Sequence, residues 1–240
     1  MINKIQKIYL LLKEALAEAI NMKIVIIDYG SGNLRSVENA FKHSINNNNL
    51  NYKVLVTNKL NLIKKADYIV LPGVGAYPDC KDGLMKIEGL VEVLIDQVIN
   101  NCKPFLGICV GMQLMVEFGF EKKETKGFGW LKGNVEKIKS IGKDALGRNL
   151  KIPHMGWNNL KIYKTNHPIL KNISELEQFY FVHSYYLNTL QKDQILADTN
   201  YNHKIPAIIG KDNFIGVQFH PEKSSKSGEK IITNWLNWKP

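Results

Sequence analysis

Short apolar runs alternate with amphipathic stretches over the first half of the chain. Four runs, at residues 23–28, 54–56, 68–71 and 105–108, are almost wholly apolar, which is typical of strands buried on both faces. Between and after them, apolar residues recur at helical spacing over residues 34–44, 84–99 and 111–118. This alternation predicts an α/β fold in which helices cover both faces of a parallel, doubly wound sheet.

The second half of the chain has a different pattern. Strand-like runs at residues 135–138, 180–182, 207–209 and 215–219 are separated by turns, and a last helix is predicted near residues 228–236. These runs predict an added layer of antiparallel or mixed strands. The asparagine-rich residues 46–51 are predicted to form a polar loop. No linker separates the halves, so residues 22–240 are expected to form one domain.

Residues 1–21 precede this domain and carry their own pattern. Their apolar residues follow at spacings of three and four, as on one face of an amphipathic helix. The longest apolar run is shorter than the roughly 7 residues of a secretory signal, and charged residues interrupt it. We expect a helical extension, or sequence upstream of a later start codon, rather than an export signal.

The chain is basic, with 32 Lys and Arg against 22 Asp and Glu and a net charge of +10. Only Arg35 and Arg148 are arginines, and the lysines are scattered rather than gathered in a stripe. Base readout and bidentate phosphate contacts favour arginine, so we do not expect a nucleic-acid partner. No run reaches the roughly 18 apolar residues of a membrane span.

Three cysteines, Cys80, Cys102 and Cys109, are too few and too irregularly spaced for a disulfide framework or a zinc site. We therefore expect no metal and a cytoplasmic location. Cys109 stands apart because an apolar strand runs into Gly107-Ile108-Cys109-Val110-Gly111 and then a helix. This is the pattern of a nucleophile elbow with sulfur as the nucleophile, at a helix N-terminus that favours the thiolate. The amide of Val110 would donate to an oxyanion there; a buried structural cysteine is the alternative.

A second signal follows a late strand. His220 and Glu222 lie two residues apart in an extended segment, so their side chains can cooperate on one side, and Pro221 stiffens the backbone between them. A carboxylate beside an imidazole fixes its tautomer and stabilises its cation. Together with a thiol, they make a complete set for acyl transfer; an isolated surface turn is the alternative.

A third signal is the sequence Pro72-Gly73-Val74-Gly75 after the strand at 68–71. Glycines around one residue let backbone amides turn toward an anion, so Gly73 and Val74 are candidates for a second oxyanion donor. No third glycine follows in register, which argues against a dinucleotide site and leaves no cofactor predicted.

Together, residues 72–75, 107–113 and 219–222 resemble the class I (triad) glutamine amidotransferases. The segments at residues 26–37, 153–158 and 180–185 are similar to one branch of that family, the glutaminase subunits of imidazole glycerol phosphate synthases. The resemblance runs from residue 22 to the end of the chain and implies the flavodoxin-like fold of that family. Val110 replaces a more usual leucine, and the loop at 46–51 is longer than in the family.

The resemblance implies a mechanism in which Cys109 attacks the carboxamide of glutamine, His220 transfers protons and Glu222 orients His220. It also implies that the Gly73–Val74 peptide flips to complete the oxyanion hole when a partner is present. The groups implied to bind the α-amino and α-carboxylate ends of glutamine are Gln113 and the backbone around His183, Ser184 and Tyr185.

The implied partner is a separate cyclase subunit with a β/α-barrel fold, which forms a heterodimer with this chain and receives ammonia from it. The candidates for the contact face around the ammonia exit are Asn33, Trp157, Tyr185 and Lys223. Three other functions stay open on the sequence: a paralogous amidotransferase that supplies ammonia to modify a surface sugar, a non-catalytic interaction module, and a cysteine hydrolase or redox protein.

Overall fold

The computed structural model describes residues 6, 22–139, 142, 147, 151–189 and 191–240. Apart from Gln6, the predicted N-terminal extension lies outside the described residues. The centre of the molecule is an eight-stranded sheet in the order β2-β1-β3-β4-β14-β13-β12-β9. It is accompanied by a two-stranded and a four-stranded sheet.

Five strands of the central sheet are parallel, as the apolar runs predict. They are β1 (Met22–Ile27), β2 (Tyr52–Thr57), β3 (Tyr68–Gly73), β4 (Phe105–Cys109) and β14 (Phe214–Val217). Every residue of β3, β4 and β14 is buried, because helices cover both faces of this part of the sheet.

The remaining strands are mostly antiparallel and confirm the predicted added layer. The central sheet continues through β13 (His203–Lys211), β12 (Ile195–Tyr201) and β9 (Lys161–Ile162). A two-stranded sheet pairs β8 (His154–Asn159) with β10 (Gln178–His183). A four-stranded sheet contains β11 (Tyr185–Thr189), β7 (Leu131–Lys137), β5 (Val116–Gly119) and β6 (Thr125–Lys126).

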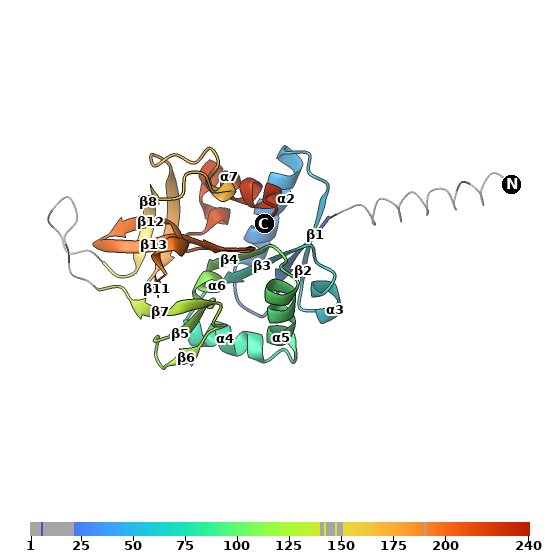
Figure 1. Ribbon diagram of the computed structural model, residues 1–240, viewed down its shortest axis with the longest axis horizontal. Helices are drawn as coiled ribbons and strands as arrows, with labels where there is room; N and C mark the ends of the chain where they lie inside the picture. The colour runs from blue at the N-terminus through green and yellow to red at the C-terminus, as the bar shows by residue number, and fades with distance from the viewer. Residues whose placement is uncertain (1–5, 7–21, 140–141, 143–146, 148–150, 190) are drawn as a thin grey trace.

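Helices lie on both faces of the parallel strands (Figure 1). On one face, α2 (Leu34–Asn47) packs beside α7 (Ser225–Asn237). On the other lie α4 (Tyr77–Met85) and α5 (Leu90–Ile95), which the π-helix η1 (Asp96–Asn100) continues. The shorter helices are α3 (Leu60–Ile63), α6 (Val110–Gln113), and the 3-10 turns η2 (Pro168–Leu170), η3 (Lys192–Gln194) and η4 (Pro221–Lys223).

The helix predicted at residues 84–99 is two helices. α4 ends at Met85 and α5 begins at Leu90, directly after Gly89, whose φ of 75° is a left-handed conformation that a helix interior does not contain. The prediction also missed the start of α4 at Tyr77, where Pro78 occupies the first turn.

The helix predicted at residues 111–118 is also wrong beyond Gln113. Val116 pairs instead with Leu131 as part of β5, and a Cβ at Gly119 would lie 2.6 Å from the ring of Tyr77. The close approach of that ring explains the glycine in the strand.

The polar loop predicted at residues 46–51 is shorter than expected, because α2 runs on through Asn47. The asparagine amides bind α7 and the end of α2 itself. Asn47 donates to Glu229 on α7 over 2.7 Å, and Asn48 donates to the carbonyl oxygen of Ser44 over 2.8 Å.

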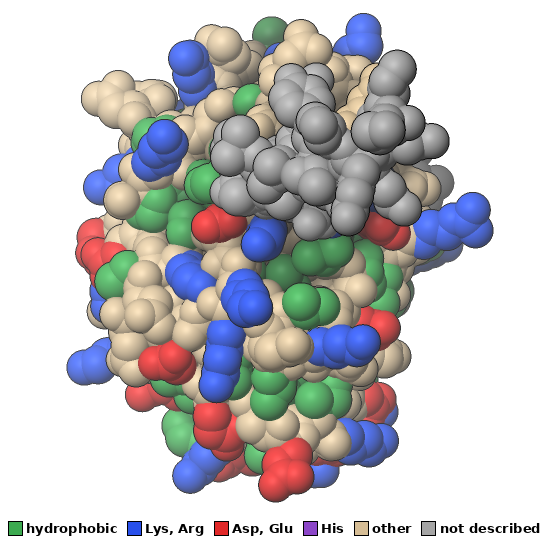
Figure 2. Space-filling model, turned by 90° about the vertical axis from the view of Figure 1, so that its right-hand side faces the viewer, with side chains coloured by type: hydrophobic (Ala, Val, Ile, Leu, Met, Phe, Trp, Pro, Cys, Tyr) green, Lys and Arg blue, Asp and Glu red, His purple; other side chains and the backbone are tan. Residues whose placement is uncertain are grey.

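The charge of the surface is mixed. Figure 2 shows lysines interspersed with acidic residues on the face it draws, without a continuous basic stripe. Within the part of the chain that the structure describes, no helix has the length and apolar character needed to cross a membrane.

Candidate active site

Cys109 occupies a strained turn between β4 and α6. Its φ of 54° and ψ of −110° lie where non-glycine residues are rarely found, which is typical of a nucleophile elbow. The flanking glycines let the turn pack tightly. A Cβ at Gly111 would lie 1.9 Å from the carbonyl oxygen of Leu71, and one at Gly107 would lie 2.6 Å from the carbonyl oxygen of Gly111.

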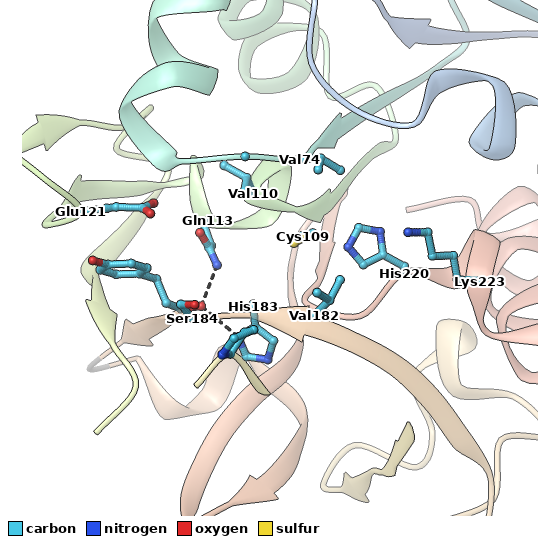
Figure 3. A pocket seen from close by; sticks show the side chains of 13 residues that line it. Val74, Cys109, Val110, Gln113, Glu121, Val182, His183, Ser184, His220 and Lys223 are labelled. Atoms are coloured by element: carbon cyan, nitrogen blue, oxygen red, sulfur yellow. Dashed lines mark hydrogen bonds between the residues drawn. The ribbon is translucent and has the colours of Figure 1, made fainter. Parts of the chain in front are cut away.

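The elbow opens into a cavity of about 290 Å³ at the carboxyl ends of the parallel strands. Ligands bind at this edge in open α/β sheets. Cys109 ends β4, Gly73 ends the neighbouring β3, and His220 follows β14 on the other side of β4. Of the residues singled out from the sequence, these line the cavity (Figure 3): Val74, Cys109, Val110, Gln113, His183, Ser184, Tyr185, His220 and Lys223.

The imidazole of His220 faces the sulfur of Cys109 across this cavity (Figure 3). Its Nδ1–H donates to Glu222 Oε1 over 2.8 Å, and the side chains of both residues are almost fully buried. The second oxygen of Glu222, Oε2, is buried without a hydrogen-bond partner among the described residues. The bond to Glu222 leaves Nε2 as the nitrogen available to the sulfur.

The electrostatics of the site favour the imidazolium form of His220. Burial acts to lower its pKa, but the charge of Cys109 and a hydrogen bond with it, together with the bond to Glu222 and its charge, raise the pKa to about 10. A cationic imidazole next to the sulfur stabilises the thiolate, which is the reactive form of cysteine.

The loop at residues 72–75, which contains the candidate second oxyanion donor, is held by Ser31 from the turn after β1. The hydroxyl of Ser31 donates to the carbonyl oxygen of Val74 over 2.5 Å and accepts from the amide of Val74 over 3.3 Å. The amide of Val74 is therefore already bonded to a protein group and not to the cavity. Gly73 packs against the elbow, where a Cβ would lie 2.7 Å from the amide nitrogen of Gly111.

Two buried glutamines connect the cavity wall to the sulfur. The amide nitrogen of Gln113 donates to the carbonyl oxygen of Tyr185 over 2.9 Å and to Gln218 Oε1 over 3.0 Å. Gln218 in turn donates from Nε2 to Cys109 Sγ over 3.6 Å. Because the nitrogen of Gln113 is used twice inside the protein, its oxygen is the atom that can accept from a ligand.

Comparisons with known proteins agree with this geometry. Residues 25–238 match the family model for glutamine amidotransferase class-I. The chain belongs to the class I glutamine amidotransferases. It is 46% identical over 222 residues to the imidazole glycerol phosphate synthase subunit HisH of Brucella suis biovar 1 (strain 1330), covering 91% of this chain and 100% of the relative. The HisH subunit of Mesorhizobium japonicum is 45% identical with the same coverage. Within its family the chain is therefore a HisH-type amidotransferase.

Solved structures show the same fold at low identity. A protein described as glutamine amidotransferase matches with a TM-score of 0.62 and 15% identity, over 88% of this chain and 96% of that one. A glutamine amidotransferase from Thermotoga maritima matches with a TM-score of 0.55, at 14% identity over 90% and 83% of the two chains. The predicted fold class is confirmed.

The amidotransferase cavity also contains residues that the sequence did not single out. Gln218 could have been found, because it lies two residues before His220 and so projects to the same side of the extended segment. Glu121 lines the cavity wall, and its carboxylate accepts from the amide of Tyr77 over 2.7 Å at the start of α4. Gly75, Pro153 and Val182 complete the lining and gave no chemical signal in the sequence.

The residues predicted to contact a partner lie at different distances from the cavity. Lys223 lines it, and its Nζ lies 5.9 Å from the ring centre of Tyr180. Trp157 is 50% exposed and meets Tyr180 edge-on at 5.9 Å, so it is not part of the core. Asn33 is exposed and caps α2 by accepting from the amide of Ser36 over 3.4 Å. No cluster of ligand side chains that could hold a metal ion occurs among residues the structure describes.

Proposed function

We propose that this amidotransferase hydrolyses glutamine at Cys109 and supplies the ammonia to the cyclase of an imidazole glycerol phosphate synthase in histidine biosynthesis. The observation that carries the chemistry is the buried row of Cys109, His220 and Glu222, in which the imidazole faces the sulfur and donates to the carboxylate. The pathway rests on relatives that are named as HisH subunits of that synthase and are matched over their full length.

In the first half of the reaction, the thiolate of Cys109 attacks the side-chain amide carbon of glutamine. A C–S bond forms, and the carbonyl oxygen takes the negative charge. When this oxyanion collapses, the C–N bond breaks, and the imidazolium of His220 gives its Nε2 proton to the departing nitrogen. Ammonia leaves, and a γ-glutamyl thioester stays on the sulfur.

In the second half, neutral His220 takes a proton from water, and the resulting hydroxide attacks the thioester carbon. The C–S bond breaks, so glutamate leaves and the thiolate–imidazolium pair is restored. Glu222 holds the imidazole in the required tautomer in both halves, since it accepts from Nδ1. Gln218 donates to the sulfur and stabilises its charge before attack.

The oxyanion formed in each half needs backbone donors. The amide of Val110 lies at the start of α6, directly after the nucleophile, and supplies one of them. The amide of Val74 would supply the second only after it leaves Ser31. We propose that the Gly73–Val74 peptide turns toward the cavity when the partner is bound, which limits glutamine hydrolysis in its absence.

The ends of glutamine that do not react are proposed to bind on the opposite wall. The free oxygen of Gln113 accepts from the α-ammonium group, and the backbone of residues 183–185 contacts the α-carboxylate and α-amino groups. These contacts place the carboxamide at the sulfur, because Gln113, residues 183–185 and Cys109 line the same cavity.

The proposed partner is a cyclase subunit with a β/α-barrel fold. Val74, which lines the cavity, is 49% exposed, and two further apolar side chains are exposed on β8, the partner strand of β10: Met155 is 65% exposed and Trp157 is 50% exposed. Met155 and Trp157 lie on the same face of β8, and neighbouring exposed apolar side chains of this kind are typical of a docking surface. Lys223 and Asn33 are proposed to contribute polar contacts to it. We place the heterodimer in the cytoplasm, where reducing conditions keep the thiol of Cys109 free.

The test compares glutamine and ammonium salts as nitrogen sources for the complex with the cyclase. The Cys109→Ala variant is expected to lose glutamine-dependent synthesis by at least about 10³-fold, because no thioester can form, and to keep ammonium-dependent synthesis. Cys102→Ala, at an exposed cysteine, is the matched control and should behave like wild type. Glutamine use by the Cys109→Ala variant would refute the proposal.

A further inference from the structure

A pair of buried histidines belongs to the cavity wall that is proposed to bind the ends of glutamine, with His183 in the lining and His154 behind it. His154 on β8 and His183 on β10 are register partners in the two-stranded antiparallel sheet. Their rings meet through Nδ1 of His154 and Nε2 of His183 at 3.0 Å, and both residues are buried. Nothing in the triad chemistry uses them, so their role is a separate question.

The hydrogen bonds at the two ends of this pair determine which ring nitrogens carry a proton. At one end, Nδ1 of His183 lies 2.9 Å from the carbonyl oxygen of Tyr185, which can only accept. His183 therefore carries its proton on Nδ1, and its Nε2 accepts from Nδ1–H of His154.

The other end gives the same direction. The amide of Asn159 donates to Asn158 Oδ1 over 2.8 Å, which fixes the orientation of the Asn158 side chain. Its Nδ2 then faces His154 Nε2 at 3.3 Å and donates to it. Both histidines are thus neutral, and the donors run one way from Asn158 through His154 and His183 to the oxygen of Tyr185.

The surroundings favour this neutral state. The ring of His154 stacks between Phe181 and Tyr201, with ring centres 4.8 and 4.0 Å away. Burial lowers the pKa of His154 to about 3, with a smaller effect of His183. Burial also lowers the pKa of His183 to about 4 despite its bond to Tyr185, and the charge of nearby His220 acts in the same direction.

The last acceptor in this series of hydrogen bonds, the carbonyl oxygen of Tyr185, lies at the proposed substrate-binding wall. The oxygen of Tyr185 receives two donors, Nδ1–H of His183 and the amide of Gln113, and both approach it from groups that are buried. The Tyr185 carbonyl, which belongs to the peptide joining Tyr185 to Tyr186, is therefore held in place next to the cavity-lining residues Ser184 and Tyr185, and it also sets the orientation of Gln113 and through it of Gln218. A displaced peptide would therefore affect binding of the glutamine ends first.

We infer that His154 and His183 are a pair of neutral positioning residues that fix the backbone at Tyr185 for recognition of the substrate's α-amino and α-carboxylate groups. The inference rests on the proposed glutaminase function of the cavity. It assigns these histidines to substrate affinity and not to proton transfer, which stays with His220.

The experiment measures labelling of Cys109 in the full chain with its cyclase subunit, using two reagents. A glutamine-mimicking diazoketone needs the α-group contacts, whereas iodoacetamide needs only a reactive thiol. His154→Leu removes the donor to His183 with an apolar side chain, and His154→Asn keeps a donor at the position of Nδ1. Thermal unfolding of each variant reports whether it is folded.

For His154→Leu, the diazoketone concentration for half-maximal labelling should rise about tenfold, the effect of losing one buried hydrogen bond, with iodoacetamide labelling unchanged. For His154→Asn, the same diazoketone concentration should rise less than about threefold. If His154→Leu does not fold, Asn158→Ala, which removes the donor to His154, replaces it. The diazoketone concentration for half-maximal labelling should then rise about threefold.

Three results would overturn the inference. The diazoketone could label His154→Leu at the same concentration as wild type, or the concentration for half-maximal labelling could rise equally for His154→Leu and His154→Asn. Alternatively, labelling of Cys109 by the diazoketone and by iodoacetamide could fall in parallel. Failure of the proposed function looks different, because wild type itself would then resist the diazoketone at Cys109.

Discussion

At the scale of single residues, Glu222 is a buried carboxylate with few hydrogen bonds. Its side chain is 2% exposed, Oε1 accepts from His220, and Oε2 has no partner in the described part of the chain. A buried carboxylate with one hydrogen bond depends on a nearby positive charge. Glu222 and the imidazolium of His220 therefore stabilise each other, and this interaction should be visible in the pH dependence of folding.

The sign of that dependence follows from the raised pKa of His220. A group whose pKa is higher in the folded state adds stability below its ordinary pKa of 6.5, and this stability is lost as the pH rises through about 10. Glu222→Gln removes the charge that helps to raise the pKa, so its unfolding free energy should fall less between pH 7 and pH 10 than that of wild type. We expect a difference of about 1 to 2 kcal/mol in urea unfolding. Parallel pH profiles for the two proteins would contradict the assigned pair.

Residue roles differed in how far the sequence could predict them. The sequence singled out Cys109 and His220, which line one cavity, because strand ends with glycines or an adjacent acid are chemically distinctive. The bond between Ser31 and Val74 could not be predicted, since it joins two loops 43 residues apart. Glu121 and Pro153 were missed for the same reason: their place at the cavity depends on the packing of other elements.

At the scale of elements, the strand–turn–helix of residues 105–113 determines the geometry of the site. The apolar runs predicted the parallel strands, because burial on both faces leaves a continuous apolar pattern. Helix ends were predicted less well. The pairing of Val116 with Leu131 is a tertiary effect that helical periodicity does not contain, whereas the left-handed Gly89 is a local conformation that only a glycine adopts readily.

The elbow should not tolerate a side chain at Gly111. An added Cβ would lie 1.9 Å from the carbonyl oxygen of Leu71, so either β3 or α6 must move. Gly111→Ala should lower the unfolding free energy by about 3 kcal/mol and abolish diazoketone labelling of Cys109. Gly30→Ala is the control: Gly30 has a φ of 80° but open space around it, so only about 1 kcal/mol should be lost. Equal costs at the two positions would show that close packing is not what requires Gly111.

At the scale of the whole molecule, one strand serves both the proposed docking surface and the substrate wall. β8 exposes Met155 and Trp157 on one face and holds His154 on the other, where it meets His183. Alternation of side chains along a strand produces this division. A partner that binds the exposed face would contact the element behind the glutamine site. No pattern in the sequence predicted this, because it depends on the pairing of β8 with β10.

Trp157→Ala should weaken binding of the cyclase subunit by about tenfold or more, because exposed tryptophans in docking surfaces contribute strongly to affinity. The melting temperature of the free chain should change little, since half of the side chain is already in water. Met85→Ala is the control, as Met85 is 56% exposed at the far end of α4. Titration calorimetry measures the affinity of both variants for the cyclase subunit. An unchanged affinity for Trp157→Ala would show that this tryptophan is not part of the interface.

The central claim is that glutamine is opened by the sulfur of Cys109, and trapping the covalent intermediate tests it most directly. The full complex is quenched with acid during glutamine turnover, digested and mapped by mass spectrometry. The account predicts a γ-glutamyl thioester on the peptide that contains Cys109 and unmodified Cys80 and Cys102. Turnover that continues with no acyl group on Cys109, or with the acyl group on another cysteine, would contradict it.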